Sequence, residues 1–156
     1  MVDRLTVEQR RLNMSRVRSK GTSPEIAVRR ILHSLGYRFR LHRRDLPGTP
    51  DIVLPRHRVA VFVHGCFWHG HQCQLFRVPA TRTKFWTTKI ETNRRRDAIA
   101  KTSLISDGWR TMCIWECAVR GRGRISEEEL GLAITAFLSG STKDSDIVGT
   151  LSFSEI

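Results

Sequence analysis

Long apolar runs are missing from this 156-residue chain, and its first residues, MVDRLTVEQRR, contain no apolar signal-peptide segment. A membrane-spanning helix needs about 20 consecutive apolar residues, and an export signal needs an apolar stretch of about 7–15. We therefore expect a protein with no membrane partner that stays in the reducing cytoplasm.

Acidic residues are scarce relative to basic ones. There are 15 Asp and Glu against 27 Lys and Arg, which gives a net charge of +12. This excess disfavours cationic partners and favours a polyanion, most often a nucleic acid. An anionic membrane surface is the alternative, but it requires an amphipathic basic helix with a strong apolar face. The apolar helix faces of this chain are better explained as core.

Cysteine is also scarce, with four residues in the chain. So few cysteines do not make a disulfide scaffold, and in a reducing compartment cysteines near histidines indicate metal ligands. The hydrophobic content of 40% is enough for an ordinary core in a single domain of this length.

Hydrophobic periodicity predicts a mixed α/β fold, with a small, mostly buried sheet flanked by helices. Thr22 and Glu25 form a capping box at the start of the first clear helix, with Pro24 in its first turn. The predicted order is helix 22–35, strand 37–41, strand 51–54, strand 59–63, helix 83–107, strand 109–115 and a short helix beginning at Ser126. We expect a basic N-terminal arm or helix over residues 1–20, the folded domain over 21–139 and a flexible tail over 140–156.

The segment HGCFWHGHQC, residues 64–73, gathers three histidines, two cysteines and two aromatic rings. Its Cys and His side chains are the ligand types that a tetrahedral zinc prefers, and a further cysteine after a predicted strand supplies a fourth. The candidate ligands are Cys66, His71, Cys73 and Cys117. Four protein ligands leave no open position, so such a zinc would be structural. The alternative is that these are ordinary loop residues and core cysteines, which is how we interpret Cys113.

Several carboxylates and a histidine are candidates for chemistry. Asp51 begins a predicted strand after Pro50 and offers the oxygen ligands that Mg²⁺ takes, although an Asp in this place is also a common turn residue. His69 lies inside the segment 64–73, which we call the aromatic loop, and is the best general acid–base candidate. Glu25 and Asp97 have structural explanations, as a capping-box glutamate and as a helical ion-pair partner beside three arginines.

Basic residues cluster in three stretches, 10–20, 38–44 and 77–96. A solvated surface explains some of them, but Phe76, Phe85 and Trp86 are interleaved with the third stretch. Cations with interleaved rings suit phosphate contact together with base stacking. Phe67 and Trp68, which a metal would hold rigidly at the surface, suit insertion between stacked bases.

Five segments together carry a resemblance to a known family. They are SRVRSKGTSPE (15–25), LPGTPDIVLP (46–55), VFVHGCFWHGHQC (61–73), PATRTKFWTTKI (79–90) and WECAVRGR (115–122). In this order and spacing they resemble the very short patch repair (Vsr) DNA mismatch endonucleases, over roughly residues 10–125. The combination of HGCFWH, PATRT-x-FW and WECA is specific to that family.

The resemblance implies a restriction-endonuclease-like α/β fold of the PD-(D/E)XK type, a mixed sheet flanked by helices, with a zinc-stapled loop. It implies an enzyme that nicks duplex DNA on the 5′ side of the thymine in a T:G mismatch, which arises when 5-methylcytosine deaminates. It also implies a bacterial, nucleoid-associated protein that acts as a monomer and accompanies a cytosine-5 DNA methyltransferase.

The resemblance further assigns roles to residues of this chain. Asp51 and the main-chain carbonyl of Val63 would bind the catalytic Mg²⁺, and His69 would be the general acid–base at the scissile phosphate. The residues holding waters around the ion would be His64, Asp97 and Glu25. The structural zinc ligands would be Cys66, His71, Cys73 and Cys117. The aromatic wedge entering from the major groove would be Phe67, Trp68 and Trp86, with the N-terminal segment in the opposite groove.

Two positions depart from the patterns that the resemblance brings with it. The wider nuclease superfamily usually has an acidic residue and a lysine on the second strand, where this chain has Phe62 and His64, as the Vsr family itself allows. The Vsr family often has threonine where this chain has Val63. If the ligand there is the backbone carbonyl, the change is harmless; if it is the hydroxyl, metal affinity falls.

Three other functions stay open at this point. A zinc-stapled module could recognise distorted duplexes without cutting them, and removal of the Asp51 carboxylate would separate binding from cleavage. A restriction-type nuclease would cut both strands of matched DNA. An RNA-binding protein would also suit the charge and the aromatic loop, and only the resemblance disfavours it.

Overall fold

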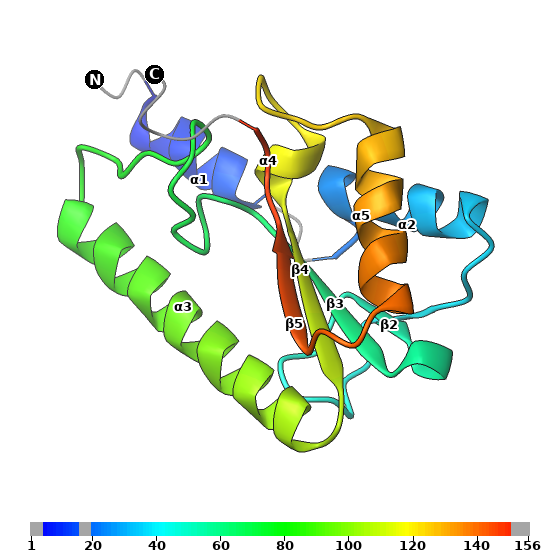
Figure 1. Cartoon of the computed structure of the whole chain (residues 1–156). Coiled ribbons are helices and arrows are strands. Elements are labelled where there is room, and N and C mark those ends of the chain that lie inside the picture. The colour runs from blue at the N-terminus through cyan, green and yellow to red at the C-terminus, as the bar shows by residue number, and fades with distance from the viewer. Residues whose placement is uncertain (1–4, 16–19, 151–156) are drawn as a thin grey trace.

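A computed structural model of the chain describes residues 5–15 and 20–150, and Figure 1 shows the arrangement of its elements. The helices are α1 (Val7–Ser15), α2 (Ser23–Ser34), α3 (Thr83–Ser106), α4 (Glu116–Val119) and α5 (Glu127–Ser139), with a 3₁₀ turn, η1 (Pro55–His57). The strands are β1 (Arg40–Leu41), β2 (Ile52–Leu54), β3 (Val59–His64), β4 (Arg110–Trp115) and β5 (Asp144–Ile147). The described residues therefore form the mixed α/β fold that the sequence predicts.

The sheet has five strands in the order β1-β2-β3-β4-β5. The pairs β1–β2 and β2–β3 are antiparallel, whereas β3–β4 and β4–β5 are parallel. His64 and Trp115, the last residues of β3 and β4, are register partners. Because these strands are parallel, the aromatic loop after β3 and helix α4 after β4 leave the sheet at the same edge. This edge is where the candidate site forms.

Helices α2 and α5 lie on one face of the sheet in Figure 1, and the main core lies between them and that face. Alternate residues of the central strands, such as Val59 and Val61 of β3, pack into it. The helices contribute Val28, Ile31, Leu32, Leu130, Ile134, Phe137 and Leu138. Both helices begin as their capping boxes predict, because Thr22 Oγ1 accepts the Glu25 N–H and Ser126 Oγ accepts the Glu129 N–H.

The other face of the sheet is covered by α3, which lies on the opposite side from α2 and α5 in Figure 1. This 24-residue helix buries few apolar residues, namely Ile90, Ala100 and Leu104. A cavity of about 520 Å³ remains between it and the sheet. Lys101 of α3 forms an ion pair with Asp144 of β5, with 3.0 Å between Nζ and Oδ2. The helix is therefore held to the sheet partly by polar contacts.

The structure differs from the sequence prediction in three elements, one of which is the short helix α4 (Glu116–Val119), where no helix is predicted. Strand 37–41 is reduced to Arg40–Leu41, because Tyr37 and Phe39 pack against the core outside the sheet. Residues 144–147 of the predicted flexible tail form β5 and pair with β4. The sequence does not predict this strand, because it is mostly polar and Ile147 is the one residue of β5 that is buried.

Residues 151–156 of the predicted tail lie outside the described residues, as do residues 1–4 and 16–19 of the predicted arm. Apart from β5, the proposed domain boundaries stay a prediction. In the described parts of the chain, no helix combines the length and apolar character needed to cross a membrane.

Candidate active site

A cleft of about 1220 Å³ opens between the start of α2, the end of β3 and the middle of α3. Its walls include Asp51, His64, Trp68, His69 and Asp97. They also include four basic side chains: Lys20, Arg30, Arg96 and Arg120. A concave surface that combines a carboxylate, histidines and cations suits a polyanionic substrate.

Asp51 reaches the cleft from the residue before β2. Its Oδ2 accepts the backbone N–H of Val63 on the neighbouring strand at 2.8 Å. Burial raises the pKa of the Asp51 carboxyl to about 6, the Glu25 charge adds to the rise, and the Val63 N–H opposes it. A bound cation beside this buried carboxylate would stabilise its charged form.

Glu25 lies in the first turn of α2 and is 2% exposed. Its Oε1 lies 2.8 Å from His42 Nε2, and its Oε2 accepts the Gly21 N–H at 2.7 Å and a bond from Arg29. Glu25, His42 and Asp51 each place a possible ligand atom within 4.8 Å of the others. We call the group of Glu25, His42 and Asp51 the carboxylate site. Glu25 belongs to it in addition to its place in the helix cap.

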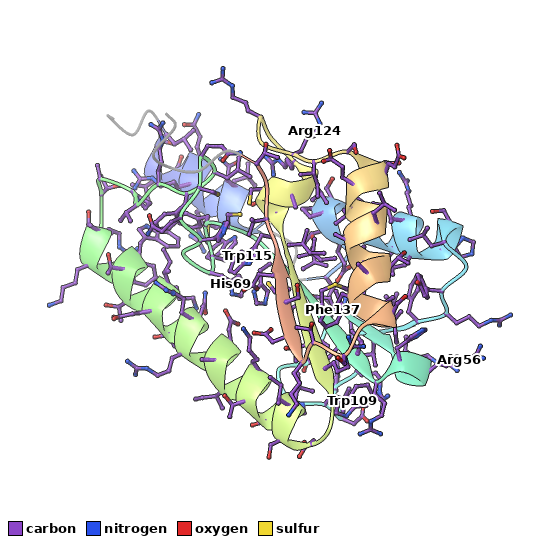
Figure 2. The ribbon with its side chains drawn as sticks, viewed as in Figure 1. Arg56, His69, Trp109, Trp115, Arg124 and Phe137 are labelled. Carbon is purple, nitrogen blue, oxygen red and sulfur yellow. The ribbon has the colours of Figure 1, made fainter. Side chains whose placement is uncertain are left out.

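His64 and His69 stack face to face, with ring centroids 3.8 Å apart and an interplanar angle of 3°. Asp97 of α3 lies beside both, with its Oδ2 2.5 Å from His69 Nδ1 and its Oδ1 3.9 Å from His64 Nε2. This contact orients His69 and leaves Nε2 as the nitrogen free to exchange a proton with a substrate. Figure 2 shows His69 beside Trp115, between α3 and the sheet.

His64 is more enclosed than its partner. Burial lowers the pKa of His64 to about 3, with a further contribution from the neighbouring His69, so the ring is neutral at physiological pH. Its Nδ1 lies 3.3 Å from Cys113 Sγ. Burial also raises the pKa of the Cys113 thiol, so this pair carries no charge. Cys113 is buried, as the sequence predicts, and also contacts a site residue.

A second cluster lies where the aromatic loop meets α4. It consists of Cys66, His71, Cys73 and Cys117, whose ligand atoms all lie within 4.8 Å of one another. The Nδ1 atom of His71 is 3.5 Å from Cys66 Sγ and 3.6 Å from Cys117 Sγ. Three thiols and one imidazole nitrogen at these separations fit a tetrahedral zinc.

The charges of this cluster support the same assignment of a metal. Sharing of a proton with Cys117 raises the pKa of Cys66, and burial raises that of Cys73. The Cys66 thiol and the Gly149 N–H lower the pKa of Cys117 to about 5. Buried thiols in contact resist ionising together, and a dication removes that conflict.

Three aromatic rings beside the cleft form one cluster. The ring centroids of Phe67, Trp68 and Trp86 are 5.2–5.8 Å apart, in edge-on contacts. Asn93 of α3 donates its side-chain N–H to the Trp68 carbonyl at 2.9 Å. Gly70 has φ +63°, and a Cβ there would lie 2.7 Å from Ile90 of α3. The loop therefore packs closely against α3.

The structure brings the sequence-predicted site residues into four neighbouring groups. Asp51, Glu25 and Val63 meet at the carboxylate site, and His64, His69 and Asp97 meet beside it. The cysteine cluster and the three rings flank them. Their roles in catalysis and DNA contact stay predictions.

Sequence reasoning missed three residues that contact these groups. His42 stood among the arginines of the stretch 38–44, where a single histidine was the available signal. Asn93 had no local signal. Glu116, inside the segment WECA, accepts the Cys66 N–H at 3.2 Å and a bond from Arg120 at 2.8 Å.

Comparison with known proteins shows the family of the chain. The model of the family described as DNA mismatch endonuclease Vsr matches residues 2–75. The Escherichia coli K12 protein named DNA mismatch endonuclease Vsr is 40% identical over 135 residues, which is 86% of this chain and 86% of that protein. The chain belongs to the Vsr family.

Other Vsr-like relatives are named nicking enzymes. The type II nicking enzyme V.XorIIP of Xanthomonas oryzae pv. oryzae is 54% identical over 125 residues, 80% of this chain and 92% of that protein. The type II nicking enzyme V.NmeAIP of Neisseria meningitidis serogroup A is 38% identical over 122 residues, 78% of this chain and 87% of that protein. The Vsr family is thus one of DNA-cleaving hydrolases.

Proposed function

We propose that this Vsr-family protein is a Mg²⁺-dependent endonuclease that nicks duplex DNA on the 5′ side of the thymine in a T:G mismatch. Such mismatches arise when 5-methylcytosine deaminates, so the nick would initiate very short patch repair. One arrangement supports this function above all. Asp51, the His69–Asp97 pair and the Trp68 ring face a single cleft lined by cations.

Asp51 and the main-chain carbonyl of Val63 are the proposed Mg²⁺ ligands. Mg²⁺ takes one or two protein carboxylates together with waters and phosphate oxygens, and the buried Asp51 carboxylate with Glu25 nearby fits that preference. The chemistry that Mg²⁺ supplies when bound is neutralisation of the charge that develops on the phosphate oxygens and activation of the attacking water. We propose that His64, Asp97 and Glu25 orient water around this site.

His69 is the proposed general acid–base. The Asp97 carboxylate at 2.5 Å fixes the His69 ring. Because Asp97 engages Nδ1, His69 Nε2 is the atom that exchanges a proton with the reacting oxygen at the scissile phosphate. A positioned histidine of this kind contributes about 10²–10⁴-fold in rate.

Mismatch preference is proposed to come from Phe67, Trp68 and Trp86 entering from the major groove. A T:G wobble pair stacks less well than a matched pair, so inserting rings beside it costs less deformation energy. The difference, about a few kcal/mol, provides discrimination that contacts with phosphates do not. The N-terminal segment is proposed to occupy the opposite groove.

The second cluster is the proposed structural zinc site. With four protein ligands it leaves no position for a substrate, so it would hold the aromatic loop against α4 and take no part in hydrolysis. A restriction-endonuclease-like fold of the PD-(D/E)XK type is part of the same proposal, with Asp51 before β2 as its acidic residue. Phe62 and His64 stand where that superfamily usually has an acid and a lysine. The Val63 side chain packs against the core, which favours its carbonyl as the ligand.

We propose that the protein acts as a monomer in the bacterial cytoplasm, in association with the nucleoid. A cytosine-5 DNA methyltransferase is the proposed functional companion, because its product deaminates to thymine opposite guanine. A monomeric mass in solution at working concentrations, measured by light scattering with and without duplex DNA, checks the first of these statements.

The decisive experiment uses end-labelled duplexes that carry a T:G mismatch in several flanking contexts, each beside a C:G control. We expect one nick next to the mismatched thymine, with Mg²⁺ and without EDTA, and no nick with Asp51→Asn. Binding without a nick in any context would favour a damage-recognition module. Cleavage of both strands of the matched duplex would favour a restriction-type nuclease, and preference for RNA would overturn the DNA assignment.

A further inference from the structure

The segment after β5 runs past α4 in Figure 1, and its residue Gly149 contacts the cysteine cluster. The backbone N–H of Gly149 lies 3.3 Å from Cys117 Sγ and donates to it. The next residue, Thr150, donates its N–H to the Gly123 carbonyl at 2.8 Å and its hydroxyl to the same oxygen at 3.2 Å. Two consecutive residues of this segment therefore attach to the cluster and to the turn after α4.

The strand register sets this contact. Ile147 of β5 pairs with Ile114 of β4, and the two strands run parallel. Gly149 therefore leaves the sheet at the same edge as Cys117. A shift of one residue in this register would put a residue with a side chain at the sulfur.

The position also requires a residue without a Cβ. A Cβ on Gly149 would lie 2.4 Å from the Cys117 carbonyl oxygen and 2.7 Å from the Gly123 carbonyl oxygen. Both obstacles are backbone atoms, so no side-chain rotation relieves the clash. The segment approaches Cys117 closely enough to donate its N–H because the residue is glycine.

A second backbone donor serves the same cluster. The N–H of Leu75 lies 3.4 Å from Cys73 Sγ. Hydrogen bonds to ligand atoms orient the ligands of a metal, and their loss typically weakens metal affinity by about 10- to 100-fold. Gly149 and Leu75 approach two of the three thiols, one from the C-terminal segment and one from the loop.

We propose that the segment 148–150 closes the zinc site, with Gly149 as a positioning residue whose N–H holds the Cys117 thiolate and slows release of the metal. This inference rests on the proposed zinc site. It assigns a function to part of the chain for which composition alone predicts a loose tail.

The test compares zinc release from the intact protein and from Gly149→Ala. Zinc content is measured first by elemental analysis, and release into an excess of a chromogenic chelator is then followed by absorbance. We expect one zinc per chain in the wild type and release about 10- to 100-fold faster from Gly149→Ala. Ile134→Val, which loosens the core away from the cysteine cluster, is the control and is expected to release zinc within about twofold of the wild-type rate.

A measurement on the wild-type sequence keeps the inference testable if Gly149→Ala does not fold. In protein loaded with ¹¹³Cd, a scalar coupling between the metal and the Gly149 amide proton is expected through Cys117 Sγ. Absence of that coupling, or equal release from Gly149→Ala, would overturn the role of the segment while the zinc site stands. Absence of zinc from the wild-type protein would overturn the proposed zinc site and the inference with it.

Discussion

Asp51, the proposed Mg²⁺ ligand, is buried at the expense of stability when its carboxyl is charged. Burial raises the pKa of its carboxyl to about 6, whereas an unperturbed Asp titrates near 3.9. The native state therefore binds this proton more tightly than the unfolded state does. The stabilisation is complete below about pH 4 and is lost as pH rises to about 6.

We expect Asp51→Asn to abolish nicking and to raise the free energy of unfolding. Near pH 7.5 and without Mg²⁺, the gain is about 1–3 kcal/mol, because the amide keeps an acceptor for the Val63 N–H without a buried charge. Urea unfolding in EDTA measures it, and the gap from wild type should widen between about pH 4 and 6 and stay level above that. Glu91→Gln, at an exposed position on α3, is the control. A constant or reversed gap would contradict the assigned burial of the charge.

His64 titrates in the opposite sense. Its lowered pKa of about 3 means that its contribution to stability is present above about pH 6.5 and is lost as pH falls. We expect the ring to stay neutral from about pH 8 down to about pH 5. Long-range ¹H–¹⁵N correlation spectra of the imidazole measure this directly, with free imidazole as the internal reference. A titration midpoint above about pH 5 would show that the ring is less enclosed than the structure indicates.

Trp68 offers a test of mismatch preference at the residue scale. We expect Trp68→Ala to reduce the ratio of affinities for mismatched over matched duplex by about tenfold or more, because a stacked base and ring are worth about 1–3 kcal/mol. The ratio is measured by competition binding with Ca²⁺ in place of Mg²⁺. Trp109, which lies apart from His69 in Figure 2, provides the matched control Trp109→Ala. An unaltered ratio would remove Trp68 from the wedge.

At the scale of elements, α3 fixes the position of the aromatic loop through two hydrogen-bonding side chains. Asn93 and Asp97 are four residues apart on this helix, so they lie on one face of it. They bond Trp68 and His69, which are consecutive in the loop. One helix therefore fixes both a ring proposed to contact bases and the proposed acid–base group.

We expect Asp97→Asn to lower the single-turnover nicking rate by about 10²–10⁴-fold, because the amide no longer selects the His69 tautomer. Affinity for the mismatched duplex should stay within about threefold of wild type. Quenched-flow nicking and fluorescence anisotropy measure the two quantities. Ile99→Ala is the control, since Ile99 is an exposed residue of the same helix. A comparable loss of binding would assign Asp97 to DNA contact instead.

Elements also differ in how much of them the sequence predicts. Helices α2 and α5 begin where their capping boxes are, since a cap depends on residues three positions apart. The predicted helix 83–107 agrees with α3 (Thr83–Ser106). In contrast, β5 was not predicted, because an edge strand of sequence DSDI is held by backbone pairing with β4 and has little apolar alternation.

At the scale of the whole molecule, the net charge of +12 favours association with DNA. Four basic residues line the cleft, and neutralising phosphates releases counterions. If the protein contacts two or more phosphates, raising the salt concentration from 50 to 200 mM would lower its affinity for DNA about tenfold or more.

We therefore expect a linear fall of log affinity with log salt, and a slope smaller by about one in Arg30→Gln. Anisotropy titrations with Ca²⁺ and a mismatched duplex measure the slope. Arg56→Gln is the control, because Figure 2 shows Arg56 well away from His69. Equal slopes for Arg30→Gln and wild type would exclude Arg30 from phosphate contact.

The sequence by itself determined the features that depend on local chemistry. Helix starts, the central strands, the basic charge and the types of the candidate metal ligands all follow from neighbouring residues or from composition. The five segments shared with the Vsr family also lie in the sequence alone. Most residues of the candidate site, though not His42, Asn93 or Glu116, could therefore be named before their positions were known.

Only the tertiary structure decided which of these residues meet. Parallel pairing of β3 with β4 brings Cys117 to the loop that holds Cys66, and the fold of α2 onto the sheet brings Glu25 near Asp51. His42, Asn93 and Gly149 acquire their contacts in the same way. The physical reason is that such contacts depend on strand register and helix packing across distant parts of the chain. No local pattern encodes either of them.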